Sequence, residues 1–176
     1  MVSFFRYYLI SLPFDESNSS SHYFYWYAFL SAARTLQIKL FEAGLPVRGA
    51  IDYGKFLVED TVFAGRCIVK AYQLSNKIEM AACVLSNDAF NNFENNDDEH
   101  NRKVVAKTFV EYLVPTKEGD QHMQTVIARP PSATKHSVIH RAVMRAFWGN
   151  GKDISQSVRP KIENTKQWLQ YLAEGT

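Results

Sequence analysis

The segment from residue 45 to residue 85 restricts the possible folds most, because glycines divide it into short elements of different kinds. Residues 46–53 have the composition of a strand, and Gly54 predicts a tight hairpin into a returning strand at residues 55–58. Residues 65–76 begin with a glycine and then show helical periodicity. A hairpin followed directly by an amphipathic helix indicates a domain in which helices pack on a sheet.

The rest of the chain alternates between strand and helix signals. A helix at residues 22–43 is expected to end at Gly44, and its aromatic first turns, apolar on all sides, indicate burial between layers. The other expected elements are strands at 4–12 and 80–85, a surface loop at 87–101 with one helical turn at 88–93, a hairpin of 103–114 with 124–128, and helices at 137–148 and 159–172. The order β-α-ββ-α-β-ββ-α-α predicts an α+β fold with helices packed on a largely antiparallel sheet.

The length and the composition are typical of one globular domain. The chain has 176 residues, of which 46% are hydrophobic and 22% are charged, and this suffices for a single core. No apolar stretch approaches the roughly 20 residues of a membrane-spanning helix, and the N-terminus lacks a signal-peptide pattern. We therefore expect a cytoplasmic protein with no membrane partner. Cys67 and Cys83 lie in apolar segments and are expected to be buried free thiols.

Positive charge is concentrated in the last third of the chain. The net charge is only +2, but residues 129–166 contain eight Lys or Arg residues against two acidic residues. Such a segment would face a polyphosphate or a nucleic acid, or it would form a solvated helix face. Only Phe147 and Trp148 in this region, with Trp168 just after it, supply Phe, Tyr or Trp rings, which is too few for single-strand recognition, so nucleic acid is not the expected partner.

Two parts of the glycine-divided segment carry a resemblance to a known family. Residues 48–54 read RGAIDYG and residues 65–74 read GRCIVKAYQL, and together they resemble the cyclase homology region of class III nucleotide cyclases. They are most similar to bacterial pyrimidine (uridylate or cytidylate) cyclases of the Pycsar antiviral system, and RPKIENTKQWL at residues 159–169 is similar to the tail of that subfamily. The resemblance implies a ferredoxin-like, cyclase-type sheet in one domain of residues 1–176, without the family's first strand and the helices after it.

The same segment supplies the candidate nucleotide-binding residues. Gly49 removes a side chain where a ligand or another backbone comes close, and Gly65 leaves N–H groups that can bind a phosphate. Simple turn geometry is the alternative for both glycines. Together with the resemblance, these signals select Arg48, Gly49, Asp52, Gly65, Lys70 and Gln73, and the candidate ligand is a nucleoside triphosphate.

The metal-binding pattern of the family is incomplete in this chain. The resemblance implies two aspartates that hold two divalent cations, one on the first strand and one on a later strand. When the sequence is aligned on residues 10–13, the later aspartate falls on Arg6, whose guanidinium repels a cation. The family's asparagine and arginine on the helix fall on Val69 and Gln73, and its base-reading position falls near Val62. We expect no metal in this chain alone, and Mg²⁺ or Mn²⁺ only where an active site is completed.

Two other metal arrangements have ordinary structural alternatives. Asp52 and Asp60 would place two carboxylates near one hairpin, or Asp60 would cap a turn while Asp52 faces solvent. His136 and His140 are four residues apart at a helix start, which is the spacing of a metal-binding face, but no third ligand is evident.

Three functional hypotheses follow. The first is a degenerate or truncated cyclase-like protein without independent activity, which regulates a cyclase or is one subunit of a cyclase dimer. The family works as head-to-tail dimers, so such a chain would lend Arg48, Lys70 or Arg145 to a partner, and exposed sheet edges predict a homodimer or a cyclase-like partner. The second is an active pyrimidine cyclase of antiphage defence, which forms a 3′,5′-cyclic nucleotide and pyrophosphate and has its missing strand upstream of Met1. The third is a nucleotide- or nucleic-acid-binding module that uses the basic last third.

Overall fold

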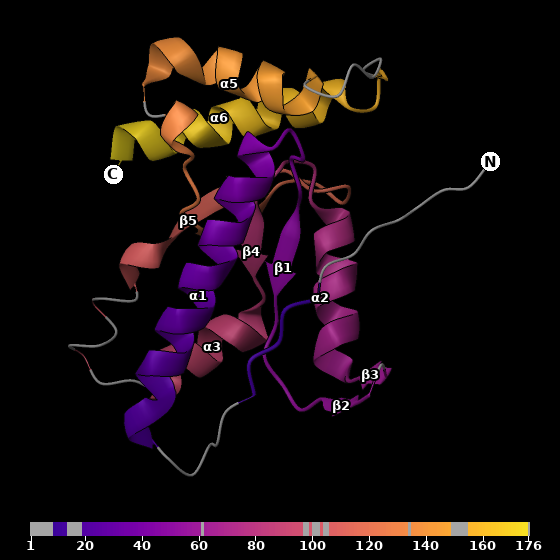
Figure 1. Cartoon of the computed structure of the whole chain (residues 1–176), viewed down its shortest axis with the longest axis vertical. Coiled ribbons are helices and arrows are strands. Elements are labelled where there is room, and N and C mark those ends of the chain that lie inside the picture. Colours follow the sequence, from indigo (N-terminus) through magenta and orange to yellow (C-terminus); the bar gives the residue numbers. More distant parts are fainter. Residues whose placement is uncertain are drawn as a thin grey trace.

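The computed structural model describes residues 9–13, 19–60, 62–96, 99, 103, 106–133, 135–148 and 155–175. These residues form two sheets and the helices that pack around them (Figure 1). The elements in chain order are α1 (Ser19–Glu42), β1 (Gly49–Ile51), β2 (Leu57–Glu59), β3 (Val62–Ala64), α2 (Arg66–Lys77), β4 (Cys83–Leu85), α3 (Asn87–Asn96), η1 (Ala106–Thr108), β5 (Phe109–Val114), β6 (Gln121–Val126), η2 (Pro131–Ala133), α5 (His136–Trp148) and α6 (Arg159–Gly175).

The main sheet has the strand order β1-β4-β6-β5. β1 and β4 are parallel, with Gly49 opposite Cys83 and Ile51 opposite Leu85, and α2 lies in the crossover between them. β6 is antiparallel to both of its neighbours. The sheet is therefore mixed and mostly antiparallel, which confirms the predicted α+β class at this level. β2 and β3 form a separate antiparallel hairpin.

The alternation of side chains along β4 divides the core into two clusters. Val84 packs in a cluster with Ile139 of α5 and Trp168 of α6. Cys83 and Leu85 pack in the second cluster, which contains buried side chains of α1 and α3. Successive residues of a strand point to opposite faces, so β4 is buried on both sides. Figure 1 shows α5 and α6 stacked together at one end of the molecule and α2 beside β1.

Several predicted elements are confirmed. The helix expected at residues 22–43 is α1, and Gly44 follows it with a positive φ of 76°. The helix expected at residues 65–76 is α2, for which Gly65 is the N-cap residue. The strand at 80–85, the hairpin of β5 with β6 and the two C-terminal helices are also present. Cys67 and Cys83 are buried free thiols, as expected.

The predicted pairing of residues 46–53 with residues 55–58 is wrong. β1 pairs with β4, and residues 57–59 pair with β3. Gly54 suggested a local hairpin, but β4 is fully buried and offers β1 an apolar partner, whereas every residue of β2 is exposed. Parallel pairing of β1 with β4 through the α2 crossover is therefore more favourable than the local hairpin that Gly54 suggested.

The expected surface loop at residues 87–101 is also wrong over its first part, because residues Asn87–Asn96 form α3. The segment is rich in Asn and Asp, but it buries Ala89 and Phe93 completely against the sheet. Asn92 also accepts a hydrogen bond from the indole N–H of Trp26 in α1, at 3.2 Å. Burial of this apolar face overrides the weak helix propensity of the polar residues.

Two expectations about the N-terminal part need correction or lie outside the description. The aromatic start of α1 is not buried on all sides, because Trp26 is 5% exposed while Phe24 is 64% exposed. The strand expected at residues 4–12 is absent from residues 9–12, which have no regular secondary structure, and residues 4–8, with Arg6, lie outside the described residues. In the part of the chain that the structure describes, no helix is both long enough and apolar enough to cross a membrane.

Candidate functional site

The carboxyl ends of β1 and β4 bring two polar side chains together. Asp52 follows β1 and Ser86 follows β4, and parallel strands place these ends at the same edge of the sheet. The backbone N–H of Ser86 donates to the carbonyl of Ile51 at 2.8 Å. The Ser86 hydroxyl donates to Oδ1 of Asp52, and its oxygen accepts the backbone N–H of Ala89 at 3.1 Å. Ser86 is thus the N-cap of α3, and Asp52 holds that cap in place.

The second carboxylate oxygen of Asp52 is in an unusual position. Oδ2 is buried, and within the described residues it accepts no hydrogen bond. An acceptor that folding removes from water without a partner costs about 1–3 kcal/mol, so a water molecule or another donor is expected to reach this oxygen. The expectation that Asp52 faces solvent is therefore wrong for this oxygen.

Lys70 connects the two helices beside this edge. Its ammonium group forms an ion pair with the carboxylate of Asp88 in the first turn of α3. The hydrogen bond from Lys70 and its positive charge lower the pKa of Asp88, and Arg66 adds a smaller effect in the same direction. Gln73 lies on α2 three residues after Lys70 and is exposed. Of the predicted set, Lys70 is thus engaged with α3 and Gln73 faces outward.

Packing leaves no room for a side chain at Gly65 and little room at Gly49. A Cβ atom at Gly65 would lie 2.7 Å from Cβ of Phe56, and one at Gly49 would lie 3.3 Å from Sγ of Cys83. Burial raises the pKa of the Cys83 thiol to about 12, so this cysteine is a thiol and not a nucleophilic thiolate. Close approach of protein groups explains both glycines, and the close neighbour in each case is the chain itself.

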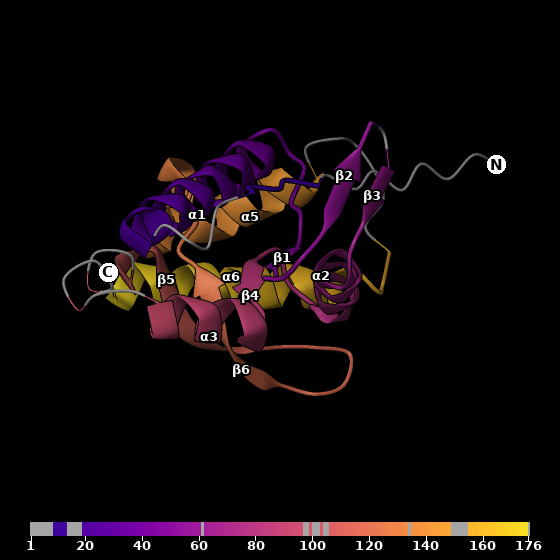
Figure 2. The same cartoon turned by 90° about the horizontal axis from the view of Figure 1, so that it is seen from below.

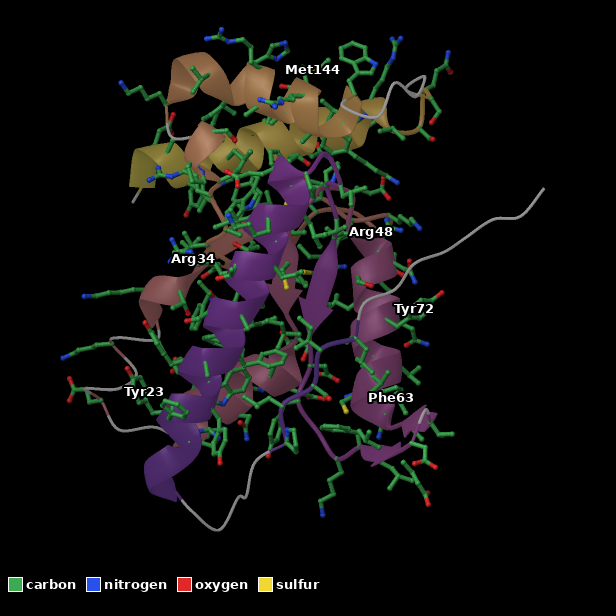
Figure 3. The ribbon with its side chains drawn as sticks, viewed as in Figure 1. Tyr23, Arg34, Arg48, Phe63, Tyr72 and Met144 are labelled. Carbon is green, nitrogen blue, oxygen red and sulfur yellow. The ribbon has the colours of Figure 1, made fainter. Side chains whose placement is uncertain are left out.

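Arg48 lies at the opposite end of β1 from Asp52 (Figure 3). Its guanidinium donates to the carbonyl of Ile78 at 3.0 Å and to Oδ1 of Asn76 at 3.2 Å, and it lies 3.9 Å from a carboxylate oxygen of Glu79. Four residues of extended chain span roughly 13 Å, so Arg48 and Asp52 do not meet in one site. Arg48 instead fastens the start of β1 to the end of α2.

The candidate metal ligands are also separated. Asp60 lies in the exposed turn between β2 and β3 with a φ of 51°, while Asp52 is bound to Ser86 beside β4. His140 is exposed on α5, and the side chain of His136 lies outside the description. Among the residues that the structure places, no group of three or more His, Cys, Asp or Glu side chains is arranged to hold a metal.

The structure contains a pocket that the sequence did not predict. It has a volume of about 200 Å³ and lies where α3 meets the β5–β6 hairpin, lined by Leu85, Asn87, Phe90, Glu111, His122, Met123 and Gln124. His122 Nδ1 lies 2.9 Å from Oε1 of Glu111 across the hairpin. Alternation along β5 and β6 predicts that these two side chains lie on one face of the hairpin. It does not predict that α3 packs beside them, because the sequence predicts a surface loop at residues 87–101.

Part of the positive charge in the last third of the chain is engaged in contacts within the fold. Arg129 donates to the carbonyl of Leu172 at 3.1 Å, and Lys161 lies 3.6 Å from Glu79. Lys166 pairs with Glu163 on the same helix. Arg145 is exposed on α5. Several of these charges therefore serve contacts within the fold, which favours the interpretation as helix surfaces over a polyphosphate site.

Comparison of the chain with family models, with curated proteins and with solved structures finds no match. The geometry described above and the resemblance of residues 48–54 and 65–74 are therefore the basis for a functional proposal.

Proposed function

We propose that this chain is a nucleotide cyclase-like protein that forms no cyclic nucleotide by itself, and that it regulates a cyclase or is one subunit of a cyclase-like dimer. The segments that carry the resemblance belong to β1 and α2, which pack against each other beside β4. They keep the backbone pattern of a strand, a glycine and a helix. The nearby carboxylates of Asp52 and Asp60 are not arranged as a pair of metal ligands.

The observation that carries the proposal is the engagement of Asp52 by Ser86. A cation on Oδ1 would compete with the Ser86 hydroxyl and would weaken the cap of α3. Asp60 is on another element and is exposed, so it does not supply a second carboxylate next to Asp52. Arg6 occupies the position that the resemblance assigns to an aspartate. Nucleotidyl cyclisation with two metal ions needs paired oxygen ligands, and Asp52 and Asp60 do not form such a pair.

A direct test is incubation of the purified chain with each of the four nucleoside triphosphates and Mn²⁺, followed by separation of cyclic nucleotides and measurement of pyrophosphate. We expect no product above a blank without protein, while an active pyrimidine cyclase under the same conditions gives product. Cyclic product from the wild-type chain that disappears in Asp52→Asn would refute the proposal and would favour an active pyrimidine cyclase. The Asp52→Asn arm separates real activity from a contaminating enzyme.

The regulatory part of the proposal has its own test. Added in excess to an active pyrimidine cyclase from the same cell, the chain is expected to change the rate of cyclic nucleotide formation. An unchanged rate over a range of chain concentrations would remove this part of the proposal.

A further inference from the structure

Helix α5 has two sides of opposite character. Its inner side is buried in the cluster that contains Trp168 of α6, and the buried residues are Ile139, Ala142, Val143 and Ala146. Figures 1 and 2 show α5 lying alongside α6 in both views. The opposite side carries residues at the spacing i, i+3, i+4 and i+7, which form one stripe along a helix. These residues are Arg141, Met144, Arg145 and Trp148, and we call the stripe the α5 outer face.

The α5 outer face combines positive charge with apolar contact area. Arg141 and Arg145 are exposed, and Trp148 is 51% exposed. Met144 lies on the same stripe and is half-buried (Figure 3). Arg, Met and Trp are enriched in protein interfaces relative to the rest of a surface, whereas Lys, Glu and Asp are depleted there. Trp and Arg are also the residues that most often dominate the binding energy of an interface.

No carboxylate balances the charge of this helix. Residues 135–148 contain no Asp or Glu and three Lys or Arg residues, namely Lys135, Arg141 and Arg145. None of the three forms an ion pair with a residue that the structure describes. The neighbouring helix differs, because Lys161 lies 3.6 Å from Glu79 and Lys166 lies 3.0 Å from Glu163. Among the described residues, α5 therefore keeps its full positive charge, whereas α6 shares part of its charge with carboxylates.

This charge pattern is unfavourable for the isolated helix. Lys135 stands at the N-terminus of α5, where its carbonyl accepts the N–H of Ile139 at 3.1 Å. The helix dipole makes this end positive, so a cation is disfavoured there, and the first turn contains no acidic residue. Arg141 and Arg145 are four residues apart, a spacing at which like charges repel each other. Departures from such local rules are expected at functional sites, and an anionic partner would relieve both repulsions.

We propose that the α5 outer face binds an acidic amphipathic segment of another protein. Carboxylates of that segment pair with Arg141 and Arg145, and its apolar side chains cover Met144 and Trp148. Arginine suits this role because its planar guanidinium binds a carboxylate through two parallel hydrogen bonds. This inference goes beyond the proposed function and does not depend on it.

The make-up of the α5 outer face favours a protein over other anionic partners. Binding to a nucleic acid depends on many phosphate contacts, and this face offers two arginines with apolar side chains beside them. A helix that lies in a membrane surface inserts its apolar side, whereas the apolar side of α5 is buried against α6. Two cations next to an apolar contact instead match a short segment in which carboxylates and apolar residues share one side.

A synthetic peptide of about 15 residues, long enough to form a helix, is the probe. It carries Glu and Leu along one helical side and contains no Trp. Calorimetry with the purified chain at about 0.15 M salt is expected to give a dissociation constant below about 100 µM, as in weak transient contacts. A peptide with Gln in place of Glu, and one with Ser in place of Leu, should each bind at least about tenfold more weakly. Equal binding of the Ser peptide would mean general charge attraction and would overturn the inference.

Trp148 reports whether the peptide occupies this face. The other two tryptophans, Trp26 and Trp168, are 5% and 1% exposed, so acrylamide quenches mainly the fluorescence of Trp148. Saturating peptide is expected to lower the quenching to the value measured for Trp148→Phe without peptide. Unchanged quenching with the peptide bound would place the peptide elsewhere on the molecule and would overturn the inference.

Reversal of one charge separates binding from folding. Arg141→Glu removes the repulsion with Arg145 and makes a Glu–Arg pair at i, i+4 in the favourable order. Tm should therefore rise by about 1–4 °C, while the affinity for the peptide should fall at least about tenfold. An unchanged affinity would overturn the inference.

The matched control is Lys107→Glu, because Lys107 is an exposed cation on η1 and the variant has the same net charge as Arg141→Glu. Its affinity for the peptide should stay within about twofold of the wild-type value, since salt screens charges that are far from the contact. A loss equal to that of Arg141→Glu would again mean general charge attraction and would contradict a specific face.

The same assays decide between this partner and other occupants. Stronger binding of a short DNA duplex, or of phosphatidylserine vesicles, than of the acidic peptide would replace the protein partner by a nucleic acid or a membrane. A dimer in sedimentation that Arg141→Glu abolishes would make a second copy the occupant. Each of these results overturns the inference and leaves the proposed absence of cyclase activity untouched.

Discussion

Replacement of Ser86 by alanine is predicted to destabilise the protein far more than a typical surface change. The hydroxyl is the N-cap of α3, and loss of such a cap costs about 1 kcal/mol. The same change removes the donor to Oδ1 of Asp52, whose Oδ2 is already buried without a described partner. A carboxylate left in that state costs about 1–3 kcal/mol more. The expected loss in the free energy of unfolding is thus about 2–4 kcal/mol.

The measurement is urea and thermal unfolding followed by circular dichroism. For a chain of this size each kcal/mol lowers Tm by about 2–4 °C, so Ser86→Ala should lower it by roughly 4–16 °C. Ser75→Ala is the matched control, because Ser75 also donates through its hydroxyl, at 2.9 Å to the carbonyl of Tyr72, but within a single helix. Its effect should stay within about 0.5 kcal/mol.

Combining Ser86→Ala with Asp52→Ala separates the two contributions. Removal of the carboxylate from the Ser86→Ala background should recover stability, because no buried oxygen is then left without a donor, and the coupling between the sites should be about 0.5–3 kcal/mol. The reasoning is refuted if Ser86→Ala is as mild as Ser75→Ala. Asp52 would then not be committed to the α3 cap, and it would be available as a cation ligand, against the proposed function.

Three further predictions concern packing, pH and thiol chemistry. Gly65→Ala should destabilise the protein by about 1–3 kcal/mol in urea unfolding, since its Cβ would meet backbone-anchored atoms at 2.7–2.9 Å, whereas Gly175→Ala, with nothing within 4 Å, should be neutral. The pKa of Asp88 is lower in the folded chain than in the unfolded chain, so its pair with Lys70 stabilises the fold above the unfolded-state pKa, and this stabilisation is lost as the pH falls through the folded-state pKa. Asp88→Asn should therefore reduce the acid dependence of Tm below about pH 4. Cys83, with a pKa of about 12, should react with a thiol reagent only as the protein unfolds, and rapid labelling at neutral pH would contradict its burial.

The elements that could be predicted from the sequence are those with their own start and stop signals. Gly44 ends α1 and Gly65 precedes α2, and both boundaries were found to within three residues of the observed ones. The β5–β6 hairpin was found because its two strands are close in sequence and alternate in polarity. Local chemistry decides such elements, so a single sequence contains enough information for them.

The elements that were missed depend on contacts far apart in the chain. The pairing of β1 with β4 needs the whole α2 crossover, while Gly54 supplied a strong but misleading local turn signal. α3 is helical because Phe93 is buried and Asn92 bonds to α1, and neither fact is visible in a run of Asn and Asp. The same limit applies to the site, since Asp52 meets Ser86 only after β1 and β4 have paired.

The exposed face of α2 links the departures from the cyclase pattern to the proposed dimer. The resemblance places the family's asparagine at Val69 and its arginine at Gln73, which lie one helical turn apart on the same face as Tyr72. A valine that is 53% exposed offers no polar group to a reaction, but its burial by a partner subunit would be favourable. Conversion of a polar reacting position into an apolar contact would be costly in a working active site and favourable in an interface. The residue at position 69 therefore argues for an assembly role of this helix face and against a catalytic one.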